Sequence, residues 1–128
     1  MKDITFYLGL SLLFTHEMDS MPNHEWRILP ILNSLSDSAG EWTFIVAHVP
    51  LFAITIAFIA SLNRSIRVRA RMIVGGFLLL HAFLHYLFSA SPVYEFSSTL
   101  SSVLIYGAAL CGLAYLLMTM FEAKTDAG

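Results

Sequence analysis

Three long apolar runs constrain the fold of this chain more than any other feature of its sequence. They occupy residues 43–62, 72–90 and 98–121, and none contains Asp, Glu, Lys or Arg. Each reaches about 20 residues, the length of a helix that crosses a hydrocarbon core roughly 30 Å thick. Only 12% of all residues are charged, whereas a soluble domain has about a quarter. The sequence therefore predicts a membrane protein.

A fourth apolar run at the N-terminus, residues 4–15, is too short to span a membrane alone. It reaches spanning length if its helix continues through His16 and Glu17 to about residue 27. Pro22 leaves an alternative, in which this helix ends near Asp19 and a short interfacial helix starts around Pro22. The sequence leaves both alternatives open.

Together these runs predict an all-α, integral membrane four-helix bundle that forms a single domain over residues 1–128. The four spans are expected at about residues 4–27, 43–62, 72–90 and 98–121. Arg64, Arg67, Arg69 and Arg71, four of the seven basic residues, lie in the connection between the second and third spans. Cytoplasmic loops carry such an excess of arginine and lysine. We therefore expect this connection and both termini on the cytoplasmic side.

All five histidines are predicted to lie on the opposite, outer side. With a rise of 1.5 Å per residue, His48 lies about 7 Å and His85 about 6 Å below the outer boundary, and His81 lies about 12 Å deep. The same estimate puts His16 in the outer half of the bilayer and His24 at or above its surface. The stretch FTHEMDSMPNHEWR, residues 14–27, is thus expected to form one wall of a polar site facing outward.

Histidines and carboxylates at matching depth point to a metal site. Ionisable residues within spans are costly and mark functional sites, and His81 and His85, four residues apart, share one helix face. Imidazole with carboxylate suits zinc, iron, manganese or copper; we expect zinc or iron, with one ion or two left open. The predicted metal ligands are His16, Glu17, His24, His48, His81 and His85.

The remaining polar residues are given roles around this site. Three histidine ligands and one open coordination position would resemble a catalytic zinc site. Glu17 and Asp19 are the candidate catalytic carboxylates. Glu17 would be either a further ligand or the base that acts on metal-bound water. Arg27 and Glu95 are candidates for binding a cofactor, and Arg27 could instead bind a substrate anion or pair with a carboxylate. Glu25 is expected at the rim of the site.

These residues predict a metal-dependent membrane enzyme acting on a lipidic or amphiphilic substrate at the outer leaflet, with hydrolysis ahead of oxidation. One alternative is a membrane electron carrier with haem b between His48 and His81 or His85. Others are a metal-free lipid- or sterol-binding bundle or isomerase, and a purely structural or assembly protein. A nucleic-acid partner is not expected, and a homodimer is left open.

Four motifs carry a family resemblance: FTHEMD…HEWRILP, AHVPLF, HAFLHYLF and YEFSS. With them, the chain resembles an uncharacterised family of small bacterial four-span membrane proteins. The resemblance implies a bacterial inner-membrane setting and no activity. In that setting, the outward-facing site predicted from the loops would face the periplasm. In layout alone, the chain is also similar to the sterol isomerase and sigma-2 receptor family, which keeps the isomerase alternative open.

Overall fold

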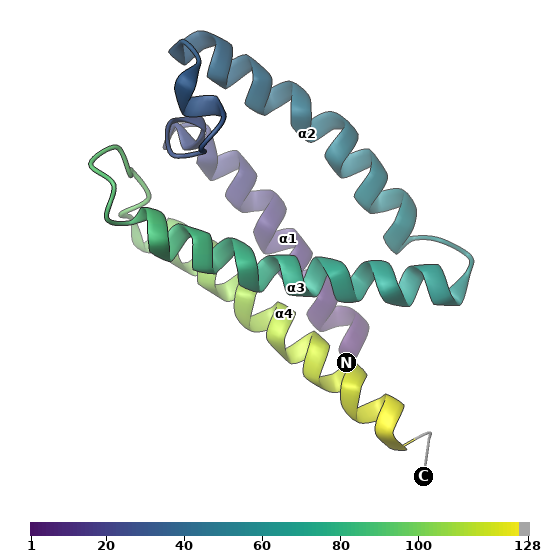
Figure 1. Ribbon diagram of the computed structural model, residues 1–128. Helices are drawn as coiled ribbons and strands as arrows, with labels where there is room; N and C mark the ends of the chain where they lie inside the picture. Colours follow the sequence, from purple (N-terminus) through teal and green to yellow (C-terminus); the bar gives the residue numbers. More distant parts are fainter. Residues whose placement is uncertain (126–128) are drawn as a thin grey trace.

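The computed structural model describes residues 1–125, and over these residues the chain is helical with no strand. The elements in chain order are α1 (Lys2–Ser20), η1 (Glu25–Arg27), η2 (Leu32–Ser34), α2 (Asp37–Ile59), α3 (Arg64–Phe88) and α4 (Thr99–Thr125), where η denotes a 3-10 helix (Figure 1). Helices α2, α3 and α4 are long and apolar enough to cross a membrane. The prediction of an all-helical chain is confirmed.

Helix α1 ends before the proline that made its length uncertain. Its last residue is Ser20, two positions ahead of Pro22, and the chain does not continue as an α-helix to residue 27. Proline lacks an N–H group, and its ring clashes with the carbonyl four residues earlier in a helix. A short 3-10 helix then begins at Glu25. The structure thus follows the alternative in which Pro22 interrupts the first helix.

Capping residues set the start of the other three helices. Ser36, Asn63 and Ser98 immediately precede α2, α3 and α4, and their side-chain oxygens accept hydrogen bonds from backbone N–H groups of the first turn. Such bonds satisfy donors that have no partner inside the helix. The long apolar helices therefore begin at positions that the local sequence specifies.

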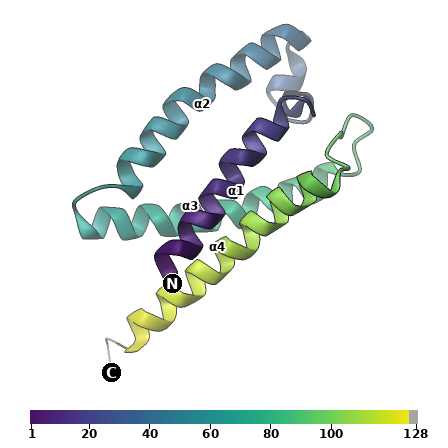
Figure 2. The same cartoon turned by 180° about the vertical axis from the view of Figure 1, so that it is seen from behind.

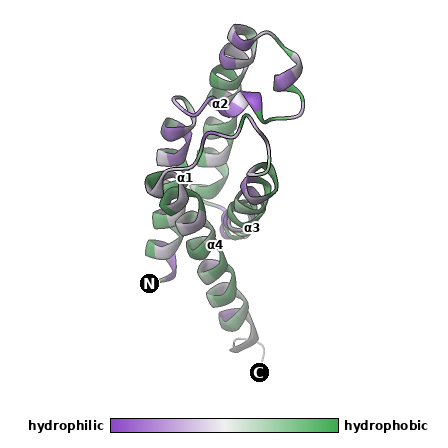
Figure 3. Ribbon diagram, turned by 90° about the vertical axis from the view of Figure 1, so that its left-hand side faces the viewer, coloured by the Kyte–Doolittle hydropathy of each residue, from purple (hydrophilic) through white to green (hydrophobic). Residues whose placement is uncertain are grey.

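Helices α1, α3 and α4 form the closely packed part of the bundle, while α2 stands apart from them along much of its length (Figures 1 and 2). Helix α1 buries Phe6, Leu10, Leu13, His16 and Ser20, whose spacing of three or four residues places them on one face. Colouring by hydropathy shows mostly apolar residues along α2 and α4 (Figure 3). The buried face of α1 thus carries the polar residue His16 into the bundle.

Ion pairs fix the relative directions of the helices. Lys2 pairs with Glu122, which joins the start of α1 to the end of α4. Arg71, near the start of α3, donates to Asp3 at 2.7 Å. At the other end of the bundle, Arg27 contacts Glu95 in the connection between α3 and α4. The helices therefore alternate in direction, with both described ends of the chain at the same end of the bundle as the arginine-rich connection.

The contact between α3 and α4 predicts opposite effects for two glycines. A Cβ atom at Gly112 would lie 2.7 Å from the carbonyl oxygen of Gly75, whereas a Cβ at Gly76 would meet nothing within 4 Å. Gly112→Ala should therefore lower the thermal stability of the detergent-purified protein, since overpacking costs about 1–3 kcal/mol. Gly76→Ala should leave it unchanged or raised, because alanine favours helices. Equal thermal shifts for the two variants would contradict this helix contact.

Candidate metal centre

Four buried side chains from three elements converge near the end of the packed helices opposite the arginine-rich connection. They are His16 on α1, Glu25 on η1, and His81 and His85 on α3. One ligand atom from each residue lies within 4.8 Å of the ligand atoms of the other three. The spacing of four residues puts both α3 histidines on the face that α1 covers. The chain thus assembles three imidazoles and one carboxylate in a single group.

Distances within this group match the size of a bound transition-metal ion. Glu25 Oε2 lies 3.5 Å from His16 Nε2, and Glu25 Oε1 lies 3.5 Å from His85 Nε2 and 3.9 Å from His81 Nε2. A tetrahedral zinc ion with bonds of about 2.0–2.1 Å holds its ligand atoms about 3.4 Å apart. The contacts of Glu25 are already near this separation, and the wider separations in the group, up to 4.8 Å, would have to shorten for the four residues to coordinate one ion.

Two members of the group have buried polar atoms with unmet hydrogen-bonding capacity. His16 is 0% exposed, and neither of its ring nitrogens has a hydrogen-bond partner among the described residues; Glu25 Oε2 also lacks one. A buried polar atom left in this state costs about 1–3 kcal/mol, and native structures hold few of them. A cation between His16 Nε2 and Glu25 Oε2 would supply the missing interaction to both atoms.

Electrostatics within the group favour an ionised Glu25. Burial by itself disfavours a charged carboxylate, but the imidazoles of His16, His81 and His85 outweigh burial and hold the pKa of Glu25 below its ordinary value. An ionised carboxylate together with imidazoles that have lost their extra proton is the donor set that zinc and iron accept. The charge of the site therefore suits a divalent cation.

Aromatic residues of the connection between α3 and α4 enclose the group. Tyr94 Oη lies 3.2 Å from His85 Nδ1, and burial raises the pKa of Tyr94 to about 12. When His85 binds a metal through Nε2, its Nδ1–H can donate to this hydroxyl, the usual outer contact of a metal-bound histidine. Phe96 is buried against the rings of His16 and His85. The site is thus supported by one hydrogen bond and sealed by one apolar ring.

An unusual backbone conformation at His24 turns the chain so that the side chain of Glu25 enters the buried group. His24 has φ 48°, the left-handed region that non-glycine residues rarely adopt. Its ring Nδ1 lies 2.9 Å from Glu95 Oε2, and this contact, together with Arg27, lowers the pKa of Glu95. The side chain of His24 thus holds the turn from outside, while the following residue points inward.

Arg27 fastens the same turn to two other parts of the chain. Its Nε and Nη2 atoms donate to the two carboxylate oxygens of Asp37 at 2.8 Å each, and its Nη1 donates to Glu95 at 3.2 Å. Trp26 Nε1 donates to Asp37 as well. A two-point contact between arginine and carboxylate fixes orientation as well as distance. These bonds hold η1, and with it Glu25, against the start of α2.

The structure separates the residues that the sequence grouped as ligands. His16, His81 and His85 lie in the buried group, and His24 contacts Glu95 instead. Glu17 and His48 form their own pair, with 3.0 Å between Glu17 Oε2 and His48 Nε2.

The other predicted site residues make structural contacts. His48 Nδ1 lies 2.7 Å from the Phe44 carbonyl oxygen. Asp19 accepts a hydrogen bond from Ser101 at 2.6 Å. Arg27 and Glu95 contact each other in the network that anchors η1.

Glu25 is the residue to which sequence reasoning gave too small a role. A straight helix would carry residues 24 and 25 about 12 Å beyond His16. Because α1 ends at Ser20 and the chain then turns, Glu25 instead lies at the level of His16. The sequence feature that could have indicated this role was the second His-Glu pair, His24-Glu25, which begins two residues after the helix-breaking Pro22.

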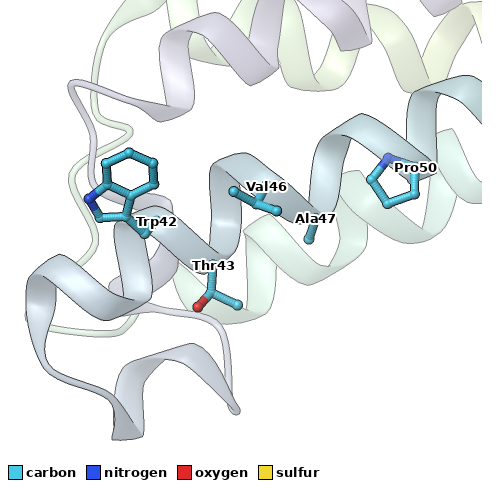
Figure 4. A pocket seen from close by; sticks show the side chains of 5 residues that line it. All are labelled: Trp42, Thr43, Val46, Ala47 and Pro50. Carbon is cyan, nitrogen blue, oxygen red and sulfur yellow. The ribbon is translucent and has the colours of Figure 1, made fainter.

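An open apolar groove lies elsewhere, along α2. Figure 4 shows its lining of Trp42, Thr43, Val46, Ala47 and Pro50, and its volume is about 490 Å³. None of the four ligand residues contributes to this lining, and no charged side chain lines the groove. The buried histidine group is therefore the candidate functional site.

The anchoring role of Arg27 predicts a local change in a variant. Arg27→Met removes the contacts to Asp37 and Glu95, so backbone amides of residues 22–36 should exchange hydrogen several-fold faster. Arg64→Met is the matched control, because Arg64 is exposed and makes no hydrogen bond or ion pair with the described residues. Hydrogen exchange followed by mass spectrometry measures both. Unchanged exchange in Arg27→Met would show that this network does not hold the turn.

Comparison with known proteins identifies a family for this chain but no activity. Residues 2–122 match the model of a family described as Family of unknown function (DUF6713). No curated protein and no solved structure matches the chain. The match agrees with the resemblance to an uncharacterised family that the sequence motifs indicated.

Proposed function

Since the chain belongs to the DUF6713 family of unknown function, we propose from the site itself that it is a membrane protein that binds a divalent transition-metal ion. The ligands in this proposal are His16, Glu25, His81 and His85. The observation that carries it is the burial of His16 Nε2 and Glu25 Oε2 without hydrogen-bond partners, 3.5 Å apart. One bound cation accounts for both atoms and for the convergence of the other two histidines.

Zinc and iron would use this group differently. Zinc in a site with four protein ligands is tetrahedral and closed, which is the arrangement of structural sites. Iron bound by histidines and a carboxylate keeps positions open for substrate or water. The predicted reaction, hydrolysis or oxidation of a lipidic or amphiphilic substrate, requires such an open position. Metal identity therefore distinguishes a stabilising role from a catalytic one.

The geometry favours a metal ion over haem. The rings of His16, His81 and His85 contact one another edge to face, with centroids 4.6–4.8 Å apart, which leaves no room for a porphyrin between them. The ring nitrogens of His48, the other predicted axial ligand, face Glu17 and a backbone carbonyl. A metal ion would also give His16 Nε2 and Glu25 Oε2 a shared partner, whereas a metal-free bundle leaves these atoms only the ion pair between them.

We place the protein in a bacterial inner membrane with both termini in the cytoplasm and the metal site toward the periplasm. The arginines at the start of α3 support this orientation, since they lie at the end of the bundle opposite the histidine group. Many large apolar side chains of α2, α3 and α4 are exposed, as expected for helices surrounded by lipid.

The metal proposal predicts a selective loss of metal in one histidine variant. Detergent-purified protein should contain about one equivalent of zinc or iron by elemental analysis, and His85→Ala should lose most of it. His48→Ala is the control, because it removes an imidazole that contacts Glu17 outside the group, and it should keep the metal. Metal-free protein after reconstitution, or equal loss in both variants, would contradict the proposed ligand set.

The orientation proposal predicts which loops are accessible from outside. In a Cys111→Ser background, Ala90→Cys in the connection after α3 should react with a membrane-impermeant maleimide in intact spheroplasts. Leu62→Cys, at a position 98% exposed in the connection after α2, should react only after the membrane is opened. The reverse pattern would overturn the orientation and leave the metal site itself unaffected.

A further inference from the structure

A second groove lies between α2 and α3, near the end of the bundle that carries the arginines. Its volume is about 380 Å³, and its lining includes Ile54, Phe58, Ile66 and Ile73, with Arg69 as its one charged side chain. Arg69 precedes His81 by twelve residues of helix, a rise of about 18 Å. This groove is therefore separate from the metal centre.

Arg69 differs from the two neighbouring arginines that stabilise the fold. Arg67 donates to the carbonyls of Ser61 and Leu62, and Arg71 donates to Asp3 and Tyr7. Arg69 is exposed and makes no hydrogen bond or ion pair with the residues whose side chains the structure describes. The groove has no acidic side chain in its lining. An uncompensated cation thus lines an otherwise apolar groove, between Ile66 and Ile73 along α3.

We propose that this groove binds an anionic phospholipid of the leaflet on the arginine-rich side. An acyl chain would lie along Ile54, Phe58 and Ile73, and the phosphate would accept hydrogen bonds from the Arg69 guanidinium, whose planar geometry suits phosphate. Because no carboxylate lines the groove, nothing there compensates the ammonium group of a zwitterionic lipid. A headgroup with net negative charge is therefore preferred.

This inference uses the membrane placement proposed above and is independent of the bound metal. The apolar groove alone would accept any acyl chain, and the arginine alone would attract any anion to the surface. Their combination requires both parts of one ligand, a chain and a phosphate, at the same site. The two requirements can be tested separately.

The test measures lipid binding to the full-length protein in detergent by native mass spectrometry. Phosphatidylglycerol, phosphatidylcholine with the same acyl chains, and glycerol 3-phosphate are the three probes. We expect one phosphatidylglycerol bound per protein, weaker binding of phosphatidylcholine, and no retention of glycerol 3-phosphate. Equal binding of the two lipids, or equal binding of glycerol 3-phosphate, would overturn the proposal.

Two arginine substitutions test whether the lipid binds in this groove. Arg69→Gln should weaken phosphatidylglycerol binding about fivefold, as expected for one basic residue at an anionic lipid surface. Arg64→Gln, the same change of charge outside the groove lining, should weaken it less than twofold. Equal weakening in both variants would show diffuse surface attraction and overturn the proposal.

A further variant keeps the test decisive if Arg69→Gln does not fold. Ile73→Trp, at a position 72% exposed, fills the groove without disturbing the core and should abolish retention of phosphatidylglycerol. Unchanged retention in Ile73→Trp would overturn the proposal. Metal content measured on the same samples separates a failure of lipid binding from a failure of the metal site.

Discussion

A carboxylate buried at the end of an apolar bundle is stable only with charged or hydrogen-bonding partners around it. Glu25 meets this requirement with His16 from α1 and with His81 and His85 from α3. The imidazoles in turn require a partner, since His16 has bare ring nitrogens. In the proposed site, a bound cation would pair with the Glu25 carboxylate and with one nitrogen of each imidazole, so the arrangement of α1, η1 and α3 centres on this one group.

The polar turn after α1 places Glu25 at the required position. Pro22 ends the helix, His24 takes a left-handed conformation, and Arg27 fastens the turn to Asp37 and the connection after α3. These contacts lie outside the buried group and support it, as the residues around a metal ligand commonly do. The density of charged and imidazole groups in this segment thus follows from the need to hold one inward-pointing carboxylate.

Sequence reasoning identified the helices and the α3 histidine pair, because apolar length and a spacing of four residues are local properties. It could not place Glu25, since a rise of 1.5 Å per residue applies only to a continuous helix and α1 stops before Pro22. The contact of Glu17 with His48 was equally out of reach. It depends on the rotation of α2 relative to α1, which no spacing within either helix specifies.

The central claim is that three histidines and one carboxylate bind a single metal ion. X-ray absorption spectroscopy of the purified, metal-loaded protein tests it most directly, because scattering from imidazole rings reports how many histidines coordinate the ion. The account predicts three imidazoles and an additional oxygen ligand, with bonds of about 2.0–2.1 Å for zinc. A coordination shell with sulfur, with only water and carboxylate oxygens, or with one imidazole would contradict it.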